Sequence, residues 1–141
     1  MKNISILYCL FFCHFISAQI YIKNGDKPYS SAVMTDNTIY VSGQIGNIEA
    51  GKKKIKTDFE TEVRQVLDKI KKLLEENGSS MNQVLKVQVM LTDMKKFDAF
   101  NKIYLQYFPE KRPARSTFGV KKLVFGAKVE IDCIALLKVK N

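Results

Sequence analysis

Residues 57–92, TDFETEVRQVLDKIKKLLEENGSSMNQVLKVQVMLT, decide the fold because they hold an amphipathic helix followed by an alternating strand. Thr57 and Glu60 form a capping-box pattern, which predicts that the helix starts at Thr57, and Asn77-Gly78 is a stop signal. From Val84 to Thr92 apolar and polar residues alternate, which is typical of a strand with one buried face. In the helical part, the apolar residues recur at helical spacing: Phe59, Val63, Val66, Leu67, Ile70, Leu73 and Leu74.

The segment that follows predicts a second helix. Asp93 is a candidate cap for its start, and Pro109 ends it because proline cannot continue the backbone hydrogen bonding. Its apolar side is aromatic, and this stripe is more often core than a ligand platform: Phe97, Phe100, Tyr104, Tyr107 and Phe108.

Four further strands complete the expected order. Residues 31–35 and 38–42 are β-prone and flank Asp36-Asn37, which predicts a hairpin turn. Residues 114–120 and 128–139 predict two more strands. The order strand, strand, helix, strand, helix, strand, strand predicts an α+β domain with its helices packed on one face of a sheet. A helix between successive strands also favours some parallel pairing.

Length and composition limit the class of protein. The 141 residues are one domain's worth of chain, and 46% hydrophobic with 26% charged residues excludes a disordered or low-complexity protein. Residues 1–18 are predicted to be a secretory signal peptide, because Lys2 precedes an apolar run (4–16) and Ser17-Ala18 offers a cleavage site. A buried N-terminal strand or a retained membrane anchor is the alternative. Cleavage would leave 19–141 as a single exported domain, periplasmic or extracellular.

The leader holds most of the reactive side chains. Without it the chain loses Cys9, Cys13 and the single histidine, His14, and the net charge falls from +9 to +8 because one lysine is removed. The remaining Cys133 cannot form an internal disulfide or a cysteine-cluster zinc site, and no histidine is left for a Ser-His-Asp or Cys-His arrangement. No phosphate-binding glycine motif is present. Carboxylates, arginine, lysine, tyrosine, hydroxyls and water remain for chemistry.

Two kinds of side chain are candidates for that chemistry. Glu130 and Asp132 share one face of the last strand, about 7 Å apart, where partial burial beside apolar neighbours would raise a carboxyl pKa into a range useful for acid–base catalysis. The pattern alone favours the alternative, a solvated face whose acids pair with lysines. Arg115 is one of three arginines, and its guanidinium can bind a carboxylate through two hydrogen bonds. Composition does not distinguish it from an ordinary surface arginine.

Several segments together resemble one family. The chain resembles the Rid (YjgF-type) family of reactive-intermediate deaminases from about Tyr21 to Val139. The proline–alanine–arginine–serine run followed by valine–glutamate–isoleucine is the most specific part of the match. The segments that carry the resemblance are Tyr40–Ile45 (YVSGQI), Leu91–Met94 (LTDM), Pro113–Thr117 (PARST) and Val129–Ala135 (VEIDCIA), with Pro28–Ser30 and Phe100-Asn101.

The resemblance implies a fold and an activity. The fold would be a chorismate-mutase-like subunit, a mixed β-sheet with two helices on one face, assembled as a homotrimer with ligand clefts between neighbours. The activity would be that of a 2-iminobutanoate/2-iminopropanoate deaminase, which hydrolyses 2-imino or enamine acids to 2-oxo acids and ammonia. The small imino acid is then the expected partner, and no metal or organic cofactor is expected.

The resemblance also implies roles for individual residues. Arg115 matches the arginine that clamps the substrate carboxylate, and Glu130 matches the acid that positions the attacking water. The remaining matches are substrate-binding positions: Tyr29 lining the cleft, Ser42 and Gly43 in the loop beside the ligand, Asn101 near the same pocket, and Thr117 near the reacting carbon, where some members have cysteine.

Departures from the family pattern leave other functions open. Lys27, Ser31 and residues 121–125 differ from the usual residues at the border of the expected cleft, and the family is mostly intracellular, so a cytoplasmic location is the alternative to export. A non-catalytic small-carboxylate-binding or chaperone-like trimer is the main alternative function. An RNA-binding protein or ribonuclease is a further one, although scattered lysines and the loss of histidine count against nucleic acid as a partner. We expect no membrane contact once the leader is removed.

Overall fold

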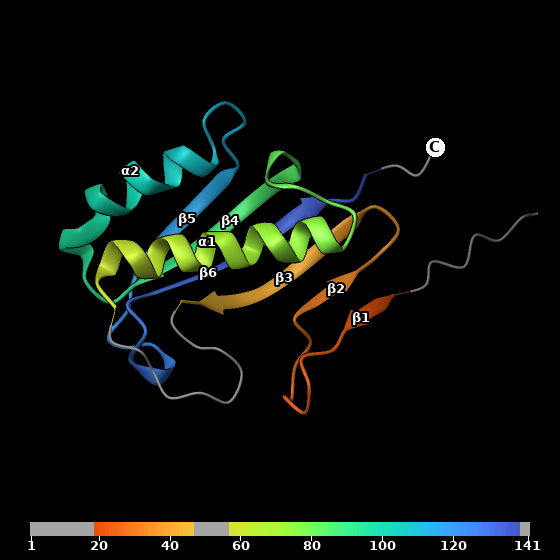
Figure 1. Cartoon of the computed structure of the whole chain (residues 1–141), viewed down its shortest axis with the longest axis horizontal. Coiled ribbons are helices and arrows are strands. Elements are labelled where there is room, and N and C mark those ends of the chain that lie inside the picture. The colour runs from red at the N-terminus through yellow and green to blue at the C-terminus, as the bar shows by residue number, and fades with distance from the viewer. Residues whose placement is uncertain (1–18, 47–56, 139–141) are drawn as a thin grey trace, which may run out of the picture.

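The computed structural model describes residues 19–46 and 57–138, in which a six-stranded mixed sheet carries two helices (Figure 1). The helices are α1 (Phe59–Glu76) and α2 (Phe97–Tyr107). Three 3₁₀ turns accompany them: η1 (Met81–Gln83), η2 (Met94–Lys96) and η3 (Val124–Gly126). The strands are β1 (Ile20–Ile22), β2 (Ala32–Met34), β3 (Thr38–Ile45), β4 (Val84–Leu91), β5 (Ala114–Gly119) and β6 (Val129–Leu136).

The sheet order is β1-β2-β3-β6-β4-β5, and it confirms the predicted parallel pairing. Strands β4 and β5 are parallel because α2 crosses between them, while the other neighbouring pairs are antiparallel. The hairpin of β2 and β3 is confirmed, with Thr35 N–H donating to the Thr38 carbonyl at 2.9 Å. The sequence did not predict β1, because three largely exposed residues carry no clear alternation.

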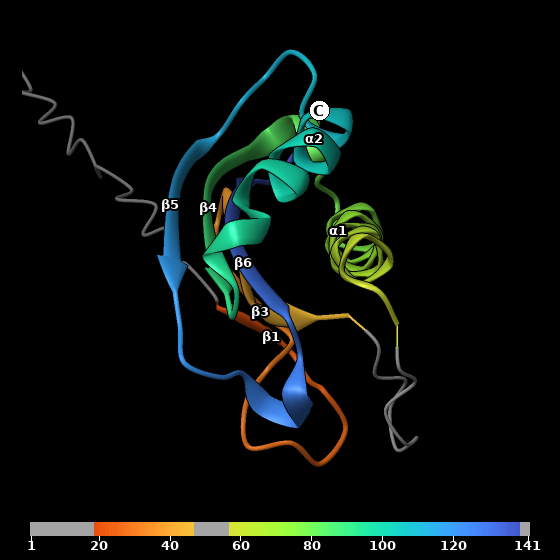
Figure 2. The same ribbon diagram turned by 90° about the vertical axis from the view of Figure 1, so that its left-hand side faces the viewer.

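Both helices pack on one face of the sheet, as predicted (Figure 2). In β6 alternate residues face them and are buried: Val129, Ile131, Cys133 and Ala135. From the helices, apolar residues at the predicted spacing fill the space above, and Phe100, Tyr104 and Phe108 of the aromatic stripe are among them. The core therefore lies between the helices and one side of the sheet.

The start of α1 corrects one prediction. Asp58, not Thr57, caps the helix, because the helix begins at Phe59 and the Asp58 carboxylate accepts from the Thr61 N–H at 2.9 Å. The Thr57 hydroxyl oxygen is instead buried without a hydrogen-bond partner. At the other end Gly78 has φ of 77°, a left-handed conformation that suits glycine, so the predicted stop is confirmed.

Asp93 caps the start of η2, which leads directly into α2, by accepting from the Lys95 N–H at 3.0 Å.

Three further predictions concern the chain ends and the membrane. The expected leader, residues 1–18, lies outside the described residues. The last strand, predicted over 128–139, ends earlier, at Leu136, and Val139 itself is outside the described residues. Among the described helices, none has the length and apolar character needed to cross a membrane.

Candidate active site

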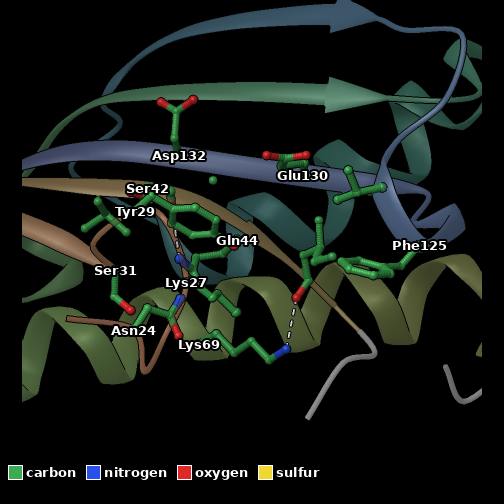
Figure 3. Close-up of a pocket in the computed structure, with 14 residues that line it drawn as sticks. Asn24, Lys27, Tyr29, Ser31, Ser42, Gln44, Lys69, Phe125, Glu130 and Asp132 are labelled. Atoms are coloured by element: carbon green, nitrogen blue, oxygen red, sulfur yellow. Dashed lines mark hydrogen bonds between the residues drawn. The ribbon is translucent and has the colours of Figure 1, made fainter. Parts of the chain in front are cut away.

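A cavity of about 720 Å³ opens where β3 meets β6 (Figure 3). Strand β6 contributes Glu130 and Asp132, and the segment between β1 and β2 contributes Tyr29 and other polar residues. Other lining residues come from β3, from Lys69 on α1, and from Val124 and Phe125 in η3. Tyr29, Ser42, Gly43 and Glu130, four of the residues predicted for the site, therefore line one cavity.

The irregular part of β3 positions two of those residues. The register between β3 and β6 shifts between Val41 and Gln44, so Ser42 and Gly43 lie in a bulge. The Ser42 hydroxyl donates to the Ser30 carbonyl at 2.7 Å, and the Ser42 N–H donates to the Ser31 carbonyl at 3.0 Å. These bonds fix the segment that carries Tyr29 against β3.

Gly43 leaves room for the Glu130 carboxyl. A Cβ atom at residue 43 would lie 2.1 Å from Glu130 Oε1, far inside contact distance. The sequence indicated Gly43 only through the family resemblance, and the structure supplies the physical reason for glycine there. The Glu130 carboxyl is therefore held directly against the backbone of the bulge.

Glu130 and Asp132 share a face of β6, as predicted, and both have raised pKa values. Burial raises the pKa of Glu130, and the nearby charge of Asp132 raises it further. Burial also raises the pKa of Asp132, against smaller lowering effects from the Gln88 side chain, which donates to it at 3.3 Å, and from Lys86. A raised pKa makes a carboxylate a stronger base and brings its ionisation closer to neutral pH, which favours a role in acid–base catalysis.

Arg115 lies in a different environment on β5. It is in register with Val87, which is buried beneath the helices, so its side chain points to the helix-covered face. Its Nη2 donates to Asn101 Oδ1 at 2.8 Å, and both residues line a second pocket of about 460 Å³. Asn101 was predicted to lie near the same pocket as Tyr29, Ser42 and Gly43, but within one chain it lines the Arg115 pocket and not the Glu130 cavity.

Three aromatic rings surround the Arg115 guanidinium. This arrangement was not predicted from the sequence. The central carbon of the guanidinium lies 4.7 Å from the centroid of the Tyr104 ring, 5.5 Å from that of Phe100 and 5.6 Å from that of Phe97. Their spacing along α2, with Asn101 on the same side, was a usable signal for such an arrangement. These cation–π contacts and the Asn101 bond hold the guanidinium in a fixed orientation.

One chain does not bring Arg115 and Glu130 together. Thr117 pairs with the buried Val89 and shares the helix-covered face with Arg115, but it lines neither pocket. Glu130 lies between two buried residues of β6 and so projects from the opposite face. Within one chain the side chains of Arg115 and Glu130 therefore lie on opposite faces of the sheet.

Cys133 takes no part in either pocket. It is buried in the core, and burial raises the pKa of its thiol to about 12, so the reactive thiolate is not formed near neutral pH. Across residues 19–46 and 57–138, no three His, Cys, Asp or Glu side chains are grouped as a metal site would need.

Comparisons with known proteins agree with the resemblance. The family model described as Endoribonuclease L-PSP matches residues 23–137. The chain is 39% identical over 110 residues to the chloroplastic Reactive Intermediate Deaminase A of Arabidopsis thaliana, an alignment covering 78% of this chain but only 59% of that protein. It is also 39% identical over 109 residues to the 2-iminobutanoate/2-iminopropanoate deaminase of Capra hircus, covering 77% of this chain and 80% of that protein. The crystal structure of yeast Mmf1 matches with a TM-score of 0.79 and 32% identity, over 86% of this chain and 100% of that one.

Proposed function

The chain belongs to the Rid/YjgF family, and from this premise and the two pockets we propose that it hydrolyses 2-imino acids to 2-oxo acids and ammonium. Expected substrates are 2-iminopropanoate and 2-iminobutanoate, because the similar goat protein is named for them. The observation that carries the proposal is the Glu130 carboxyl, which has a raised pKa and faces a cavity against Gly43.

Glu130 serves this reaction as base and then as acid. The protonated imine is already electrophilic, so water needs only the loss of one proton to attack its carbon. The Glu130 carboxylate accepts that proton as the C–O bond forms. The protonated carboxyl then returns the proton to the nitrogen. As the C–N bond breaks, the carboxylate takes the proton of the new hydroxyl group and passes it to the departing ammonia, so a 2-oxo acid and ammonium leave. One water is consumed and no external oxidant or reductant is needed.

Arg115 anchors the other end of the substrate. A guanidinium held by three rings and Asn101 is preorganised to bind the imino acid carboxylate through two hydrogen bonds. Since Arg115 and Glu130 lie on opposite faces of one sheet, the proposal includes a homotrimer in which Arg115 of one subunit meets Glu130 of the next. Exposed apolar side chains on the face without helices support such an assembly, among them Tyr40 and Phe118.

A trapping assay tests the activity. An amino-acid oxidase generates the imine in the presence of semicarbazide, and the purified protein is expected to suppress semicarbazone formation. Arg115→Ala is expected to lose this effect because the carboxylate is no longer held. Arg64→Ala is the control, since Arg64 is an exposed residue of α1 bonded to Gln106, outside both pockets. Equal suppression by Arg115→Ala and the wild type would remove the site assignment.

A carboxylate-binding protein without turnover is the second candidate. It is favoured by one observation, that Arg115 and Asn101 line a pocket to which Glu130 does not contribute. Such a protein would bind a 2-oxo acid saturably and release no ammonium from the imine above the uncatalysed rate. Measuring ammonium release beside semicarbazone trapping therefore separates the two functions.

A further inference from the structure

The turn η3 presents two apolar side chains to the Glu130 cavity. Phe125 is 72% exposed and Val124 is 61% exposed, the two highest values among the large apolar residues that the structure describes. Both line the same cavity as Glu130, together with Tyr29, which is 52% exposed. Figure 3 shows Phe125 at the end of the cavity where Glu130 lies, with Asn24 and Ser31 towards the other end.

The backbone at Phe125 is held in a conformation that phenylalanine rarely adopts. Its φ is 53° and its ψ is 18°, and in the described parts of the chain it is the one non-glycine residue with positive φ. The Cβ atom crowds the backbone in this left-handed region, so it is usually occupied by glycine or asparagine. A bulky side chain under such strain, at the wall of a cavity, indicates a functional role for its position.

The cavity is also large for the smallest expected substrate. Pockets of about 300–1,000 Å³ bind ligands of drug size, and this cavity measures about 720 Å³. In the proposed reaction, Arg115 binds the carboxylate end and Glu130 acts at the imine carbon. The substrate side chain then extends into the space that the neighbouring subunit leaves free, and there it would meet Val124, Phe125 and Tyr29.

We propose that Val124 and Phe125 form the wall that binds the substrate side chain, so that the preferred substrates are 2-imino acids with bulky apolar or aromatic side chains. This inference rests on the proposed function and specifies its substrate class. An apolar side chain placed on this wall leaves water, and so do the exposed Phe125 and Val124 surfaces, which favours binding. A methyl side chain gains little from the same surface.

The role of Val124 and Phe125 is tested by measuring kcat/KM for imines whose side chains differ in size. The imines of alanine, leucine and phenylalanine are generated in place by an amino-acid oxidase. The wild type is expected to show kcat/KM at least about tenfold higher for the two larger imines. Phe125→Asn tolerates positive φ but removes the apolar surface. It is expected to lose about tenfold in kcat/KM on the larger imines and less than about twofold on the alanine imine.

A matched control and a binding measurement separate the possible failures. Leu85→Asn makes the same kind of replacement at an exposed residue of β4 outside the cavity, and is expected to leave kcat/KM unchanged for every imine.

Calorimetry on the full-length protein then compares the binding of 4-methyl-2-oxopentanoate with that of pyruvate. If no imine is hydrolysed, the proposed function fails, but tighter binding of the larger 2-oxo acid, lost in Phe125→Asn, would still support the wall. The inference would be overturned if the wild type turned over large and small imines with equal kcat/KM and bound the two 2-oxo acids equally tightly. It would also be overturned if Phe125→Asn lowered kcat/KM equally for all imines, or if neither 2-oxo acid bound.

Discussion

Gly43 has no side chain because the Glu130 carboxyl occupies the space where a Cβ atom would lie. Gly43→Ala is therefore expected to push the carboxyl out of position without unfolding the protein, since the Glu130 side chain can rotate into the open cavity. A displacement of about 1 Å in a catalytic group can cost about 100-fold in rate, and we expect a loss of that order in kcat. Steady-state kinetics on imines, with circular dichroism to confirm folding, measure it.

Gly119→Ala is a matched control for that substitution. A Cβ atom there would meet Met94 Cγ at 2.8 Å, again a flexible side chain, but away from the Glu130 cavity. It is expected to retain the wild-type rate. If Gly43→Ala were as active as Gly119→Ala, the position of the Glu130 carboxyl would not matter for turnover.

Asp132 raises the pKa of Glu130 through its negative charge, and removing that charge gives a prediction with a definite sign. In Asp132→Asn the ionised form of Glu130 is no longer opposed by a like charge, so its pKa is expected to fall. Burial, the larger cause of the shift, remains, so the pKa stays above its ordinary value. The acid limb of the pH profile of kcat/KM should move to lower pH, and ¹³C NMR titration of the Glu130 carboxyl should show the same direction. A movement to higher pH would contradict this account of the charge interaction.

At the scale of elements, a buried glutamate joins α1 to the strand that carries Glu130. Glu62 is fully buried and accepts from the Lys128 N–H at 2.6 Å, while the Lys128 amine lies 3.5 Å from its other oxygen. In Glu62→Ala the Lys128 N–H loses its buried acceptor, whereas the Lys128 amine is about a third exposed and still donates to the Thr57 carbonyl. A polar group left without its partner typically costs about 1–3 kcal/mol, so Glu62→Ala is expected to lower the free energy of unfolding by about 2 kcal/mol in urea denaturation.

Two variants sharpen that prediction. Glu62→Gln keeps an oxygen that can accept from the Lys128 N–H, so it is expected to cost less than Glu62→Ala. Glu76→Ala removes the exposed pair with Lys72, whose atoms lie 3.7 Å apart, and is expected to change stability by less than about 1 kcal/mol. Equal effects of Glu62→Ala and Glu76→Ala would mean that the contacts of the buried Glu62 with Lys128 do not hold α1 to the start of β6.

Helices and strands whose apolar residues recur at a clear spacing could be predicted from the sequence, and those without such a spacing could not. Helix α1 and the strands β4 and β6 follow directly from their apolar spacing, because one face of each must be buried. The short β1 was missed because its pairing with β2, not its own residues, makes it a strand. The capping residue was misplaced by one position, since Thr57 and Asp58 are both good caps and only the backbone decides between them.

The sequence could not predict which of the site residues lie together in the folded chain. The resemblance named the residues, but the segment from 114 to 119 has no alternation that would reveal which face Arg115 occupies. Its face depends on pairing with β4, a contact between segments far apart in the chain. The separation of Arg115 from Glu130 onto opposite faces is therefore a property of the assembled sheet.

At the scale of the whole molecule, the face of the sheet without helices bears on how the site is completed. Tyr40, Ile134 and Lys86 lie across it in register, and Met90 and Phe118 lie beside Glu130 in the same way. Tyr40 and Phe118 are about half exposed in the single chain. Large exposed apolar side chains gathered on one face are typical of a surface that another chain covers. A second copy of this chain is the partner that would also bring an arginine to Glu130.

Mixing two inactive variants tests whether each site draws on two subunits. Arg115→Ala and Glu130→Gln are each expected to be inactive, since every site lacks either the anchor or the base. When they are unfolded together and refolded in equal amounts, a composite site recovers both groups wherever a subunit with Arg115 adjoins one with Glu130. For a ring of identical interfaces, random mixing predicts about a quarter of the wild-type activity. If both groups came from the same chain, every mixed site would still lack one, and the refolded mixture would stay as inactive as either variant alone.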